Sequence, residues 1–265
     1  MKKYLVIGNP IDHSLSPLLH NFWIKENNIK AIYKRKKIDK ENLEDIILQI
    51  KKNQIQGVNV TVPHKKNIIP FIDQLSPEAE ATQSVNTIYL NENKVIGHNT
   101  DIAGFELSLK KTKYYAYDKK IFILGAGGVV PSIIFSLKKM NASSIIISNR
   151  TKHKALELQK LFKNLEIIDW GKIPEFDIII NATSIGLRKN DRIDLDFSKV
   201  GSNKLFYDVI YNPGETNFLK EGKKLGNQVE NGKLMFVYQA YEAFRLWHKV
   251  KPNITKETLE LIEND

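Results

Sequence analysis

The chain has no cysteine, and none of its apolar runs approaches 18 residues. Without thiols it cannot form disulfides or thiolate metal sites, which fits a reducing compartment. Without a long apolar run it offers no membrane-spanning helix. The apolar segment at residues 4–7 breaks at Gly8-Asn9-Pro10, which indicates a first strand and not a signal peptide. We therefore expect a cytoplasmic protein with no membrane partner.

Arginine is also scarce, because only five of the 40 basic residues are arginine. The remaining lysines occur singly or in pairs along the chain, although the formal net charge reaches +10. This scatter is typical of a solvated surface and argues against a nucleic-acid partner. The positive field would still help to gather anionic small molecules.

The first hundred residues alternate strand and helix patterns, which predicts an α/β domain. Proline follows a possible serine N-cap at both Ser16-Pro17 and Ser76-Pro77, so each pair is expected to begin a helix. The predicted strands are 4–7, 31–38, 58–62, 86–90 and 94–98, and the predicted helices begin at 16, 40, 76 and 101.

The second half continues the alternation in a form that predicts a doubly wound parallel sheet of the Rossmann type. Its expected strands are 120–124, 144–148, 166–169, 177–180 and 205–209. Two final helices, at about 232–249 and 255–263, could pack back on the first domain. The expected domains are therefore residues 1–101, with 240–265 returning to them, and residues 102–239.

Polar side chains interrupt the valines of segment 58–65. A period of two places Val58, Val60 and Val62 on one face, so that Asn59 and Thr61 can line a cleft. Pro63 ends the strand, and we expect Lys65 at the mouth of that cleft.

Three further polar segments lie near the ends of elements of the same domain. They are 14–17, 84–87 and 97–101, and they contribute Ser14, Ser16, Asn86 and Asp101. Together with segment 58–65 they supply hydroxyls, amides, one amine and one carboxylate. Such a set suits a polyhydroxylated small-molecule ligand.

A glycine-rich turn follows the strand at 120–124 and precedes a helix. In Gly125-Ala126-Gly127-Gly128 the first and third residues permit a tight turn and close approach of a pyrophosphate. Val130 replaces the last glycine of the usual fingerprint. After the next strand comes Arg150, with Lys154 one helical turn later, which favours NADP over NAD because an arginine matches a 2′-phosphate.

These motifs occur in a fixed order along nearly the whole chain, and in that order they resemble the shikimate dehydrogenase family. The matching segments are SLSPLLHN at 14–21, NVTVPHK at 59–65, VNT at 85–87, GHNTD at 97–101, GAGG at 125–128, NRT at 149–151, NATSIG at 181–186, DVIYNPGET at 208–216 and GKLMFVYQA at 232–240. The resemblance implies NADPH-dependent, reversible reduction of 3-dehydroshikimate to shikimate in aromatic amino-acid biosynthesis.

The resemblance also implies roles for individual residues. Lys65 and Asp101 would form the catalytic pair. The substrate would contact Ser14, Ser16, Asn59, Thr61, Asn86, Tyr211 and Gln239. The cofactor would contact Gly125, Ala126, Gly127, Gly128, Val129, Asn149, Arg150, Thr151, Lys154, Thr183, Val209 and Gly232. Hydride transfer to a ketone requires a nearby acid, and a lysine ammonium oriented by a carboxylate can serve.

Several alternatives stay open at this point. A related enzyme could use NAD and accept quinate, although Arg150 and the Ser14/Ser16 pair argue against it. A non-catalytic NADP sensor is a second possibility, although a sensor has no use for Lys65 beside Asp101. The histidines lack ligand spacing, so we expect no metal. Monomer and homodimer are equally compatible with the sequence.

Overall fold

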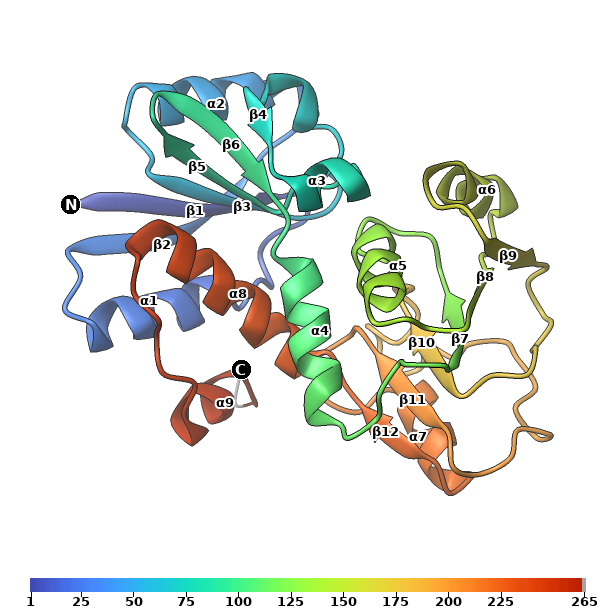
Figure 1. The fold of residues 1–265 in the computed structure, drawn as a ribbon. Helices are drawn as coiled ribbons and strands as arrows, with labels where there is room; N and C mark the ends of the chain where they lie inside the picture. The colour runs from blue at the N-terminus through green and yellow to red at the C-terminus, as the bar shows by residue number, and fades with distance from the viewer. Residues whose placement is uncertain (264–265) are drawn as a thin grey trace. The chain divides into compact units, whose positions relative to one another are not determined.

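The computed structural model describes residues 1–263 and divides the chain into two compact units. Unit 1 comprises residues 1–104 and the chain from residue 237 onward, and unit 2 comprises residues 105–236 (Figure 1). Each division lies three residues from the boundary expected from the sequence. Within the described residues, no helix is both long enough and apolar enough to cross a membrane.

Unit 1 is built on a mixed sheet with the strand order β2-β1-β3-β5-β6-β4. β1 pairs in parallel with β2 and β3, whereas β5 is antiparallel to both β3 and β6. The β5–β6 hairpin was expected, and its two turn residues, Glu92 and Asn93, both have positive φ, as a tight two-residue hairpin requires. The strands are β1 Lys2–Gly8, β2 Ala31–Lys37, β3 Gly57–Val60, β4 Gln74–Leu75, β5 Thr87–Asn91 and β6 Lys94–His98.

Helices cover both faces of this sheet (Figure 1). On one face, α2 places Ile46, Ile47 and Ile50 against Val58 and Ile88, so its apolar stripe forms the core. The predicted helix at 40–52 opens with a short 3-10 turn before α2. The helical segments that lie wholly or mostly in unit 1 are α1 Ser16–Glu26, η1 Lys40–Asn42, α2 Leu43–Lys51, η2 Ile69–Phe71, α3 Pro77–Thr82, α8 Lys233–His248 and α9 Lys256–Glu263. α4 Asp101–Lys111 begins in unit 1 and continues into unit 2.

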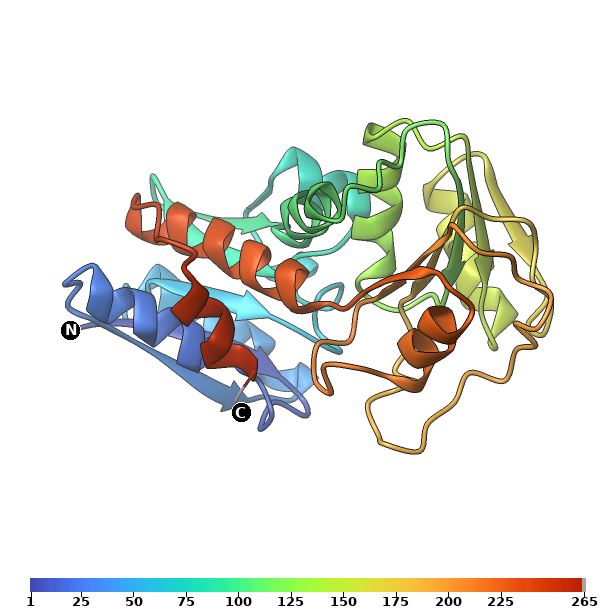
Figure 2. The same cartoon turned by 90° about the horizontal axis from the view of Figure 1, so that it is seen from below.

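On the other face, aromatic rings of α1 and α8 pack together over the sheet. Trp23 and Phe244 meet edge to face at 5.7 Å. A Cβ on Gly57 would collide with the Trp247 ring, so the glycine lets α8 approach β3. The Trp23 indole donates to the Asn253 carbonyl at 3.1 Å, and α9 lies beside α1 (Figure 2). The expectation that the final helices pack on the first domain is therefore confirmed.

Unit 2 contains an entirely parallel sheet with the order β12-β11-β10-β7-β8-β9. This arrangement confirms the predicted doubly wound fold. The strands are β7 Lys120–Leu124, β8 Ser144–Ser148, β9 Leu165–Ile168, β10 Ile178–Asn181, β11 Leu205–Asp208 and β12 Gln228–Glu230, and the helices are α5 Val130–Lys139, α6 Lys152–Leu161 and α7 Asn217–Lys224.

Both faces of this second sheet are buried, as its isoleucine-rich strands require. Ile121 and Ile123 point to the side covered by α5 and α6. Phe122 and Leu124, which alternate with them, belong to the cluster that Phe218 of α7 completes. The carboxyl ends of these strands carry the glycine-rich turn and the predicted cofactor residues.

Candidate active site

The strand that carries the first polar motif is shorter than predicted. β3 ends at Val60, not at residue 62. Val62 is 58% exposed, so the prediction that it shares the core face with Val58 and Val60 is wrong. The chain leaves the sheet early because Pro63 has no N–H to donate to a neighbouring strand.

The turn that replaces the end of the strand returns Lys65 to the edge of the sheet. The His64 N–H donates to the Thr61 carbonyl at 2.9 Å, and the His64 ring nitrogen Nε2 lies 2.8 Å from the Ile38 carbonyl. The Val85 N–H donates to the Lys65 carbonyl at 2.9 Å. Two motifs that are twenty residues apart are thereby joined through their backbones.

Lys65 forms an ion pair with Asp101, and the pair is the chemical centre of unit 1. The Lys65 Nζ lies 2.5 Å from the Asp101 Oδ2, and the two side chains are only 13% and 8% exposed. Asp101 is the first residue of α4, where the positive end of the helix dipole favours a carboxylate. Its N–H donates to the Asn99 Oδ1 at 3.1 Å. The predicted meeting of Lys65 and Asp101 is present in the structure.

Asn86 holds the second oxygen of this carboxylate. Its Nδ2 donates to the Asp101 Oδ1 at 2.8 Å, while its Oδ1 accepts from the Thr100 N–H at 2.8 Å. The Thr100 N–H therefore fixes the orientation of the Asn86 amide, and the amide in turn fixes the orientation of the Asp101 carboxylate. An ammonium held in this way retains N–H groups for a reacting oxygen, so the pair can act as a positioned acid.

Ser14 and Ser16 lie in the loop before α1 and in its first turn. Ser16 is not the N-cap that the sequence predicted, because Leu15 occupies that position without a side-chain cap. The Ser16 N–H instead donates to the Ser14 hydroxyl at 3.4 Å, and the Arg35 side chain donates to the Ser14 carbonyl at 2.9 Å. The physical reason is that Leu15 already has helical backbone angles, so Ser16 lies inside the first turn and cannot act as the cap.

Asn59 is buried, with 6% of its surface exposed, and all of its polar side-chain atoms bond within the chain. Its Oδ1 accepts from the Tyr33 hydroxyl at 2.7 Å. Its Nδ2 donates to the Asn86 carbonyl at 3.1 Å and to the Thr87 hydroxyl at 3.0 Å. Thr61, at the end of the same strand, is only partly buried.

The glycine-rich turn of unit 2 fits a pyrophosphate. Gly125 has a φ of 112°, and a Cβ there would lie 2.8 Å from the Ala182 carbonyl oxygen. At Gly127 the nearest atom to a Cβ is that same oxygen, at 3.8 Å, so the space beside the Gly127 backbone is unoccupied by protein atoms. α5 follows directly, with Pro131 in its first turn, as expected. The positive end of a helix dipole therefore follows a turn made only of glycine and alanine.

The end of β8 carries the residues predicted to read a 2′-phosphate. The Asn149 Nδ2 donates to the Thr151 carbonyl at 2.8 Å and shapes the turn before α6. Arg150, Thr151 and Lys154 are all exposed at this end of the sheet. Two cations at the carboxyl end of the second strand fit the phosphate of NADP.

A buried carboxylate organises the next two loops of unit 2. Asp208, fully buried at the end of β11, accepts from the Thr216 hydroxyl at 2.7 Å, the Ile210 N–H at 3.0 Å and the Asn181 Nδ2 at 3.1 Å. The Asn181 Oδ1 accepts from the Thr183 hydroxyl at 2.7 Å. Burial raises the pKa of Asp208 to about 6, against the lowering effect of its hydrogen bonds.

The remaining predicted residues divide between the units. In unit 2, a Cβ on Gly232 would collide with the Val209 carbonyl, so the segment before α8 approaches β11 as only glycine allows. The Tyr211 ring stacks on Phe236 at 4.5 Å. In unit 1, Gln239 lies on α8 and is partly buried.

Sequence reasoning missed four residues that support this site: Tyr33, Thr87, Thr100 and Asp208. Thr87, Thr100 and Asp208 fall inside quoted motifs, so a search for buried partners of Asn86 and Asn181 could have found them. Tyr33 lies in the lysine-rich strand β2, where no local signal marks it.

The histidines do not form a metal site. Within residues 1–263, no cluster of three or more potential metal-ligating His, Cys, Asp or Glu residues occurs. The His98 Nδ1 lies 2.7 Å from the Ser76 hydroxyl. His20 is buried among aromatic rings, and burial lowers its pKa to about 3.

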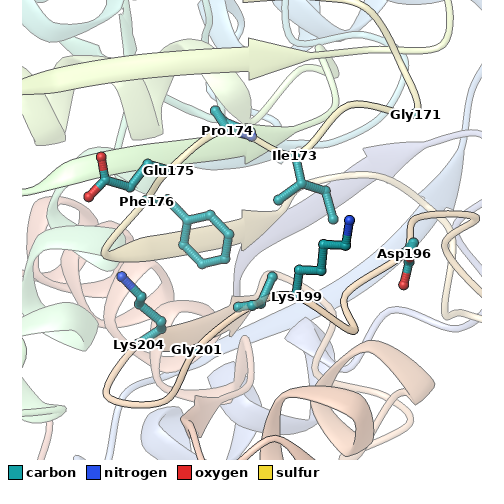
Figure 3. Close-up of a pocket in the computed structure, with 10 residues that line it drawn as sticks. Gly171, Ile173, Pro174, Glu175, Phe176, Asp196, Lys199, Gly201 and Lys204 are labelled. Carbon is teal, nitrogen blue, oxygen red and sulfur yellow. The ribbon is translucent and has the colours of Figure 1, made fainter.

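A cavity of about 430 Å³ lies elsewhere in unit 2, at the amino ends of β10 and β11 (Figure 3). It is formed by the loops at 171–176 and 196–204, with Lys204 placed 5.9 Å from the centre of the Phe176 ring. None of the predicted site residues lines it. The glycine-rich turn lies at the opposite edge of the sheet, after the carboxyl end of β7, so this cavity is separate from the predicted cofactor residues.

Comparison with known proteins agrees with this geometry. The family model described as the shikimate dehydrogenase substrate binding domain matches residues 6–88, and the one described as shikimate/quinate 5-dehydrogenase matches residues 106–193. The chain is 57% identical to the shikimate dehydrogenase (NADP(+)) of Pelagibacter ubique, over 99% of both chains.

Two crystal structures extend the similarity to the fold. Shikimate dehydrogenase from Aquifex aeolicus is 34% identical, with a TM-score of 0.91 over 100% of this chain and 98% of that one. The Thermus thermophilus enzyme, solved in complex with NADP(H) and shikimate, is 30% identical, with a TM-score of 0.90 over 100% and 99% of the two chains. The chain therefore belongs to the shikimate dehydrogenase family.

Proposed function

We propose that this chain is an NADP-dependent oxidoreductase that interconverts 3-dehydroshikimate and shikimate, with Lys65 and Asp101 as its catalytic pair. The activity and the cofactor follow from the family and from the NADP-dependent relative that is 57% identical over the full length. The observation that carries the residue assignment is the buried ion pair of 2.5 Å between the Lys65 amine and the Asp101 carboxylate.

Reduction of a ketone places negative charge on its oxygen, so that oxygen must receive a proton. NADPH, when bound, supplies the hydride for the carbonyl carbon. The Lys65 ammonium donates a proton to the developing alkoxide, and Asp101 keeps the amine in place. Asn86 fixes the carboxylate through its 2.8 Å bond to Oδ1. In the oxidative direction, the neutral amine takes the proton from the substrate hydroxyl.

We assign substrate binding to polar groups of unit 1, including Gln239 of α8, and to Tyr211 of unit 2. The Ser14 and Ser16 hydroxyls are suited to the substrate carboxylate, and Thr61 to a ring hydroxyl. The full set proposed to surround the substrate is Ser14, Ser16, Asn59, Thr61, Asn86, Tyr211 and Gln239.

We assign NADP binding to the carboxyl edge of the sheet in unit 2. The turn at 125–129 would hold the pyrophosphate on its amides and on the N-terminus of α5. Asn149, Arg150, Thr151 and Lys154 would surround the 2′-phosphate. Thr183, Val209 and Gly232 would lie near the nicotinamide.

Replacement of Lys65 tests the mechanism. We expect Lys65→Ala to lower kcat for shikimate oxidation by about 100-fold or more, because a positioned acid or base contributes that much. Shikimate should still bind, as measured by its thermal stabilisation of the variant. Lys66→Ala is the matched control, since Lys66 is exposed next to Lys65. Equal turnover in the two variants would remove Lys65 from the mechanism.

Substrate and cofactor identity can be tested in one assay that offers shikimate or quinate with NADP or NAD. The proposal requires shikimate with NADP to give the highest kcat/KM of the four combinations. A preference for quinate with NAD would overturn it, and cofactor binding without any turnover would identify a sensor.

We also propose that the protein works in the cytoplasm on small molecules alone, as a monomer or homodimer. The lack of cysteine supports a reducing compartment. Sedimentation of the purified chain at several concentrations would identify its oligomeric state, and a larger assembly would contradict the proposal.

A further inference from the structure

Asn181 lies at the carboxyl end of β10 with 0% of its surface exposed, and its side-chain amide makes four hydrogen bonds. The Nδ2 donates to the Asp208 Oδ1 and to the Ile185 carbonyl, each at 3.1 Å. The Oδ1 accepts from the Thr183 N–H at 3.1 Å and from the Thr183 hydroxyl at 2.7 Å. The amide therefore closes the turn that follows β10 and joins this turn to the end of β11.

The partners of the amide fix its orientation. The Thr183 N–H can only donate and the Ile185 carbonyl can only accept, so the oxygen of Asn181 must face Thr183 and the nitrogen must face Ile185. The Asp208 Oδ1, which also accepts from the Ile210 N–H at 3.0 Å, requires the nitrogen on its side as well. A flipped amide would lose all of these bonds.

This orientation decides how the Thr183 hydroxyl can bond. Because the Asn181 Oδ1 faces it, the hydroxyl donates its one proton to Asn181. One of its lone pairs accepts from the Ile185 N–H at 3.0 Å. A hydroxyl has one donor and two acceptor positions, so one lone pair remains. Since Thr183 is partly exposed, a ligand can reach this lone pair, but only a ligand group that donates a hydrogen bond can use it.

The sheet order places Thr183 beside one half of the predicted cofactor. β7, which ends at the glycine-rich turn, lies between β8 and β10. A Cβ on Gly125 would lie 3.1 Å from the Thr183 methyl carbon, so Thr183 borders that turn. Arg150, assigned to the 2′-phosphate on the adenosine half, follows β8 on the other side. Thr183 therefore faces the nicotinamide side of the pyrophosphate, where the hydroxyls of the ribose are the nearest hydrogen-bond donors of NADP.

We propose that Asn181 is a positioning residue for the nicotinamide half of NADP: its amide holds the Thr183 hydroxyl as an acceptor for a hydroxyl of the nicotinamide ribose. Asn181 acts through Thr183 and does not touch the cofactor, because its own side chain is fully buried and fully bonded. The inference rests on the proposed function and adds to it the direction of one hydrogen bond.

Thr183→Val tests the contact itself. NADPH binding would be measured by fluorescence, and binding of 2′,5′-ADP, which carries the adenosine half of NADP without the nicotinamide ribose, by calorimetry. The Kd for NADPH should rise about tenfold, as expected for the loss of one hydrogen bond, and the Kd for 2′,5′-ADP should change less than about twofold. Thr183→Ser keeps the hydroxyl and should bind both ligands as the wild type does. Equal weakening of both ligands in Thr183→Val, or of neither, would overturn the inference.

Asn181→Ala tests the positioning role. It should raise the Kd for NADPH about tenfold and the Kd for 2′,5′-ADP less than about twofold, whereas a merely structural role would weaken both alike. In a Thr183→Val background, Asn181→Ala should raise the Kd for NADPH by less than about twofold, and full additivity would show that the amide does not act through Thr183.

Asn227→Ala is the matched control. Asn227 is also a buried asparagine of unit 2, with 8% of its surface exposed, and its Oδ1 accepts from the Lys204 N–H at 2.9 Å. It precedes β12, at the opposite edge of the sheet from the glycine-rich turn. Both dissociation constants should stay at the wild-type value in this variant, and a selective loss of NADPH binding here would contradict the inference.

The two proposals fail in different ways. If the wild-type chain does not oxidise shikimate at all, the proposed function is wrong. If the wild-type chain is active and Thr183→Val and Asn181→Ala both bind NADPH as it does, only the role of Asn181 is wrong. Thr183→Val alters a partly exposed side chain, so it decides the matter even if Asn181→Ala does not fold.

Discussion

His20 should make unit 1 sensitive to acid. Its ring is 1% exposed, and neither ring nitrogen has a hydrogen-bond partner in the described structure. Burial, with a smaller contribution from His248, lowers the pKa of His20 from 6.5 to about 3. The neutral ring is stable in the fold, whereas a proton on it would be buried without a counter-charge.

The size of the effect follows from proton linkage. Between pH 6.5 and pH 3 the unfolded chain carries a proton on His20 that the folded chain lacks. The stabilisation is therefore complete above pH 6.5 and is lost as the pH falls toward 3. Each pH unit in that window changes the free energy of unfolding by about 1.4 kcal/mol. Acidification to pH 5 crosses about 1.5 of these units, so it should cost about 2 kcal/mol.

His20→Phe should remove this loss, because phenylalanine keeps the ring contacts and takes up no proton. We would measure urea unfolding at pH 7 and pH 5 in a Trp170→Phe background, where fluorescence reports Trp23 and Trp247 of unit 1. Between pH 7 and pH 5, the free energy of unfolding of the chain that keeps His20 should fall by about 2 kcal/mol more than that of His20→Phe. His153→Gln, on exposed α6, is the control and should behave like wild type. The same loss in His20→Phe and wild type would refute the reasoning.

Two further variants test the cofactor site. Arg150→Asp should lower the preference for NADP over NAD in kcat/KM at least tenfold, which is about 1.4 kcal/mol. The control Lys163→Asp, beyond the other end of α6, should leave the preference unchanged. An unchanged preference in Arg150→Asp would show that Arg150 does not contact the 2′-phosphate. Gly125→Ala should lower the free energy of unfolding by about 1–3 kcal/mol, because Gly125 has a positive φ and lies close to the Ala182 carbonyl. Gly127→Ala should have a melting temperature near that of the wild type but should bind NADPH more weakly. Equal melting temperatures for the two alanine variants would contradict this account.

The parts of the fold that follow from local chemistry could be predicted from sequence. The isoleucine-rich strand β7 ends at a glycine turn, so both the parallel sheet and the phosphate-binding edge can be read from residues 120–128. Ser76 caps α3 as expected, its hydroxyl accepting from the Ala79 N–H at 3.2 Å. In each case the residues that decide the structure are neighbours in the chain.

The errors arise where distant partners decide. Ser16 looks like an N-cap by its sequence neighbours, but the loop before α1, whose Ser14 carbonyl accepts from Arg35, places Leu15 at the cap position. Val62 fits the alternation of a strand, yet β3 ends at Val60 and the Val62 carbonyl accepts from the Asn9 N–H, in the loop after β1. The Lys65–Asp101 pairing was available before the structure only because the ordered motifs resemble a known family, since a separation of thirty-six residues carries no local signal.

The shared carboxylate of Asp208 has a consequence for protein engineering. It receives donors from the segment that starts at Asn181 and from the segment that ends at Thr216, so each loop depends on the other for its shape. In a chimera that takes only one of these loops from a relative, the donor of the retained loop would face a loop that does not match it. The two loops should therefore be transplanted as a single cassette, together with the aspartate between them.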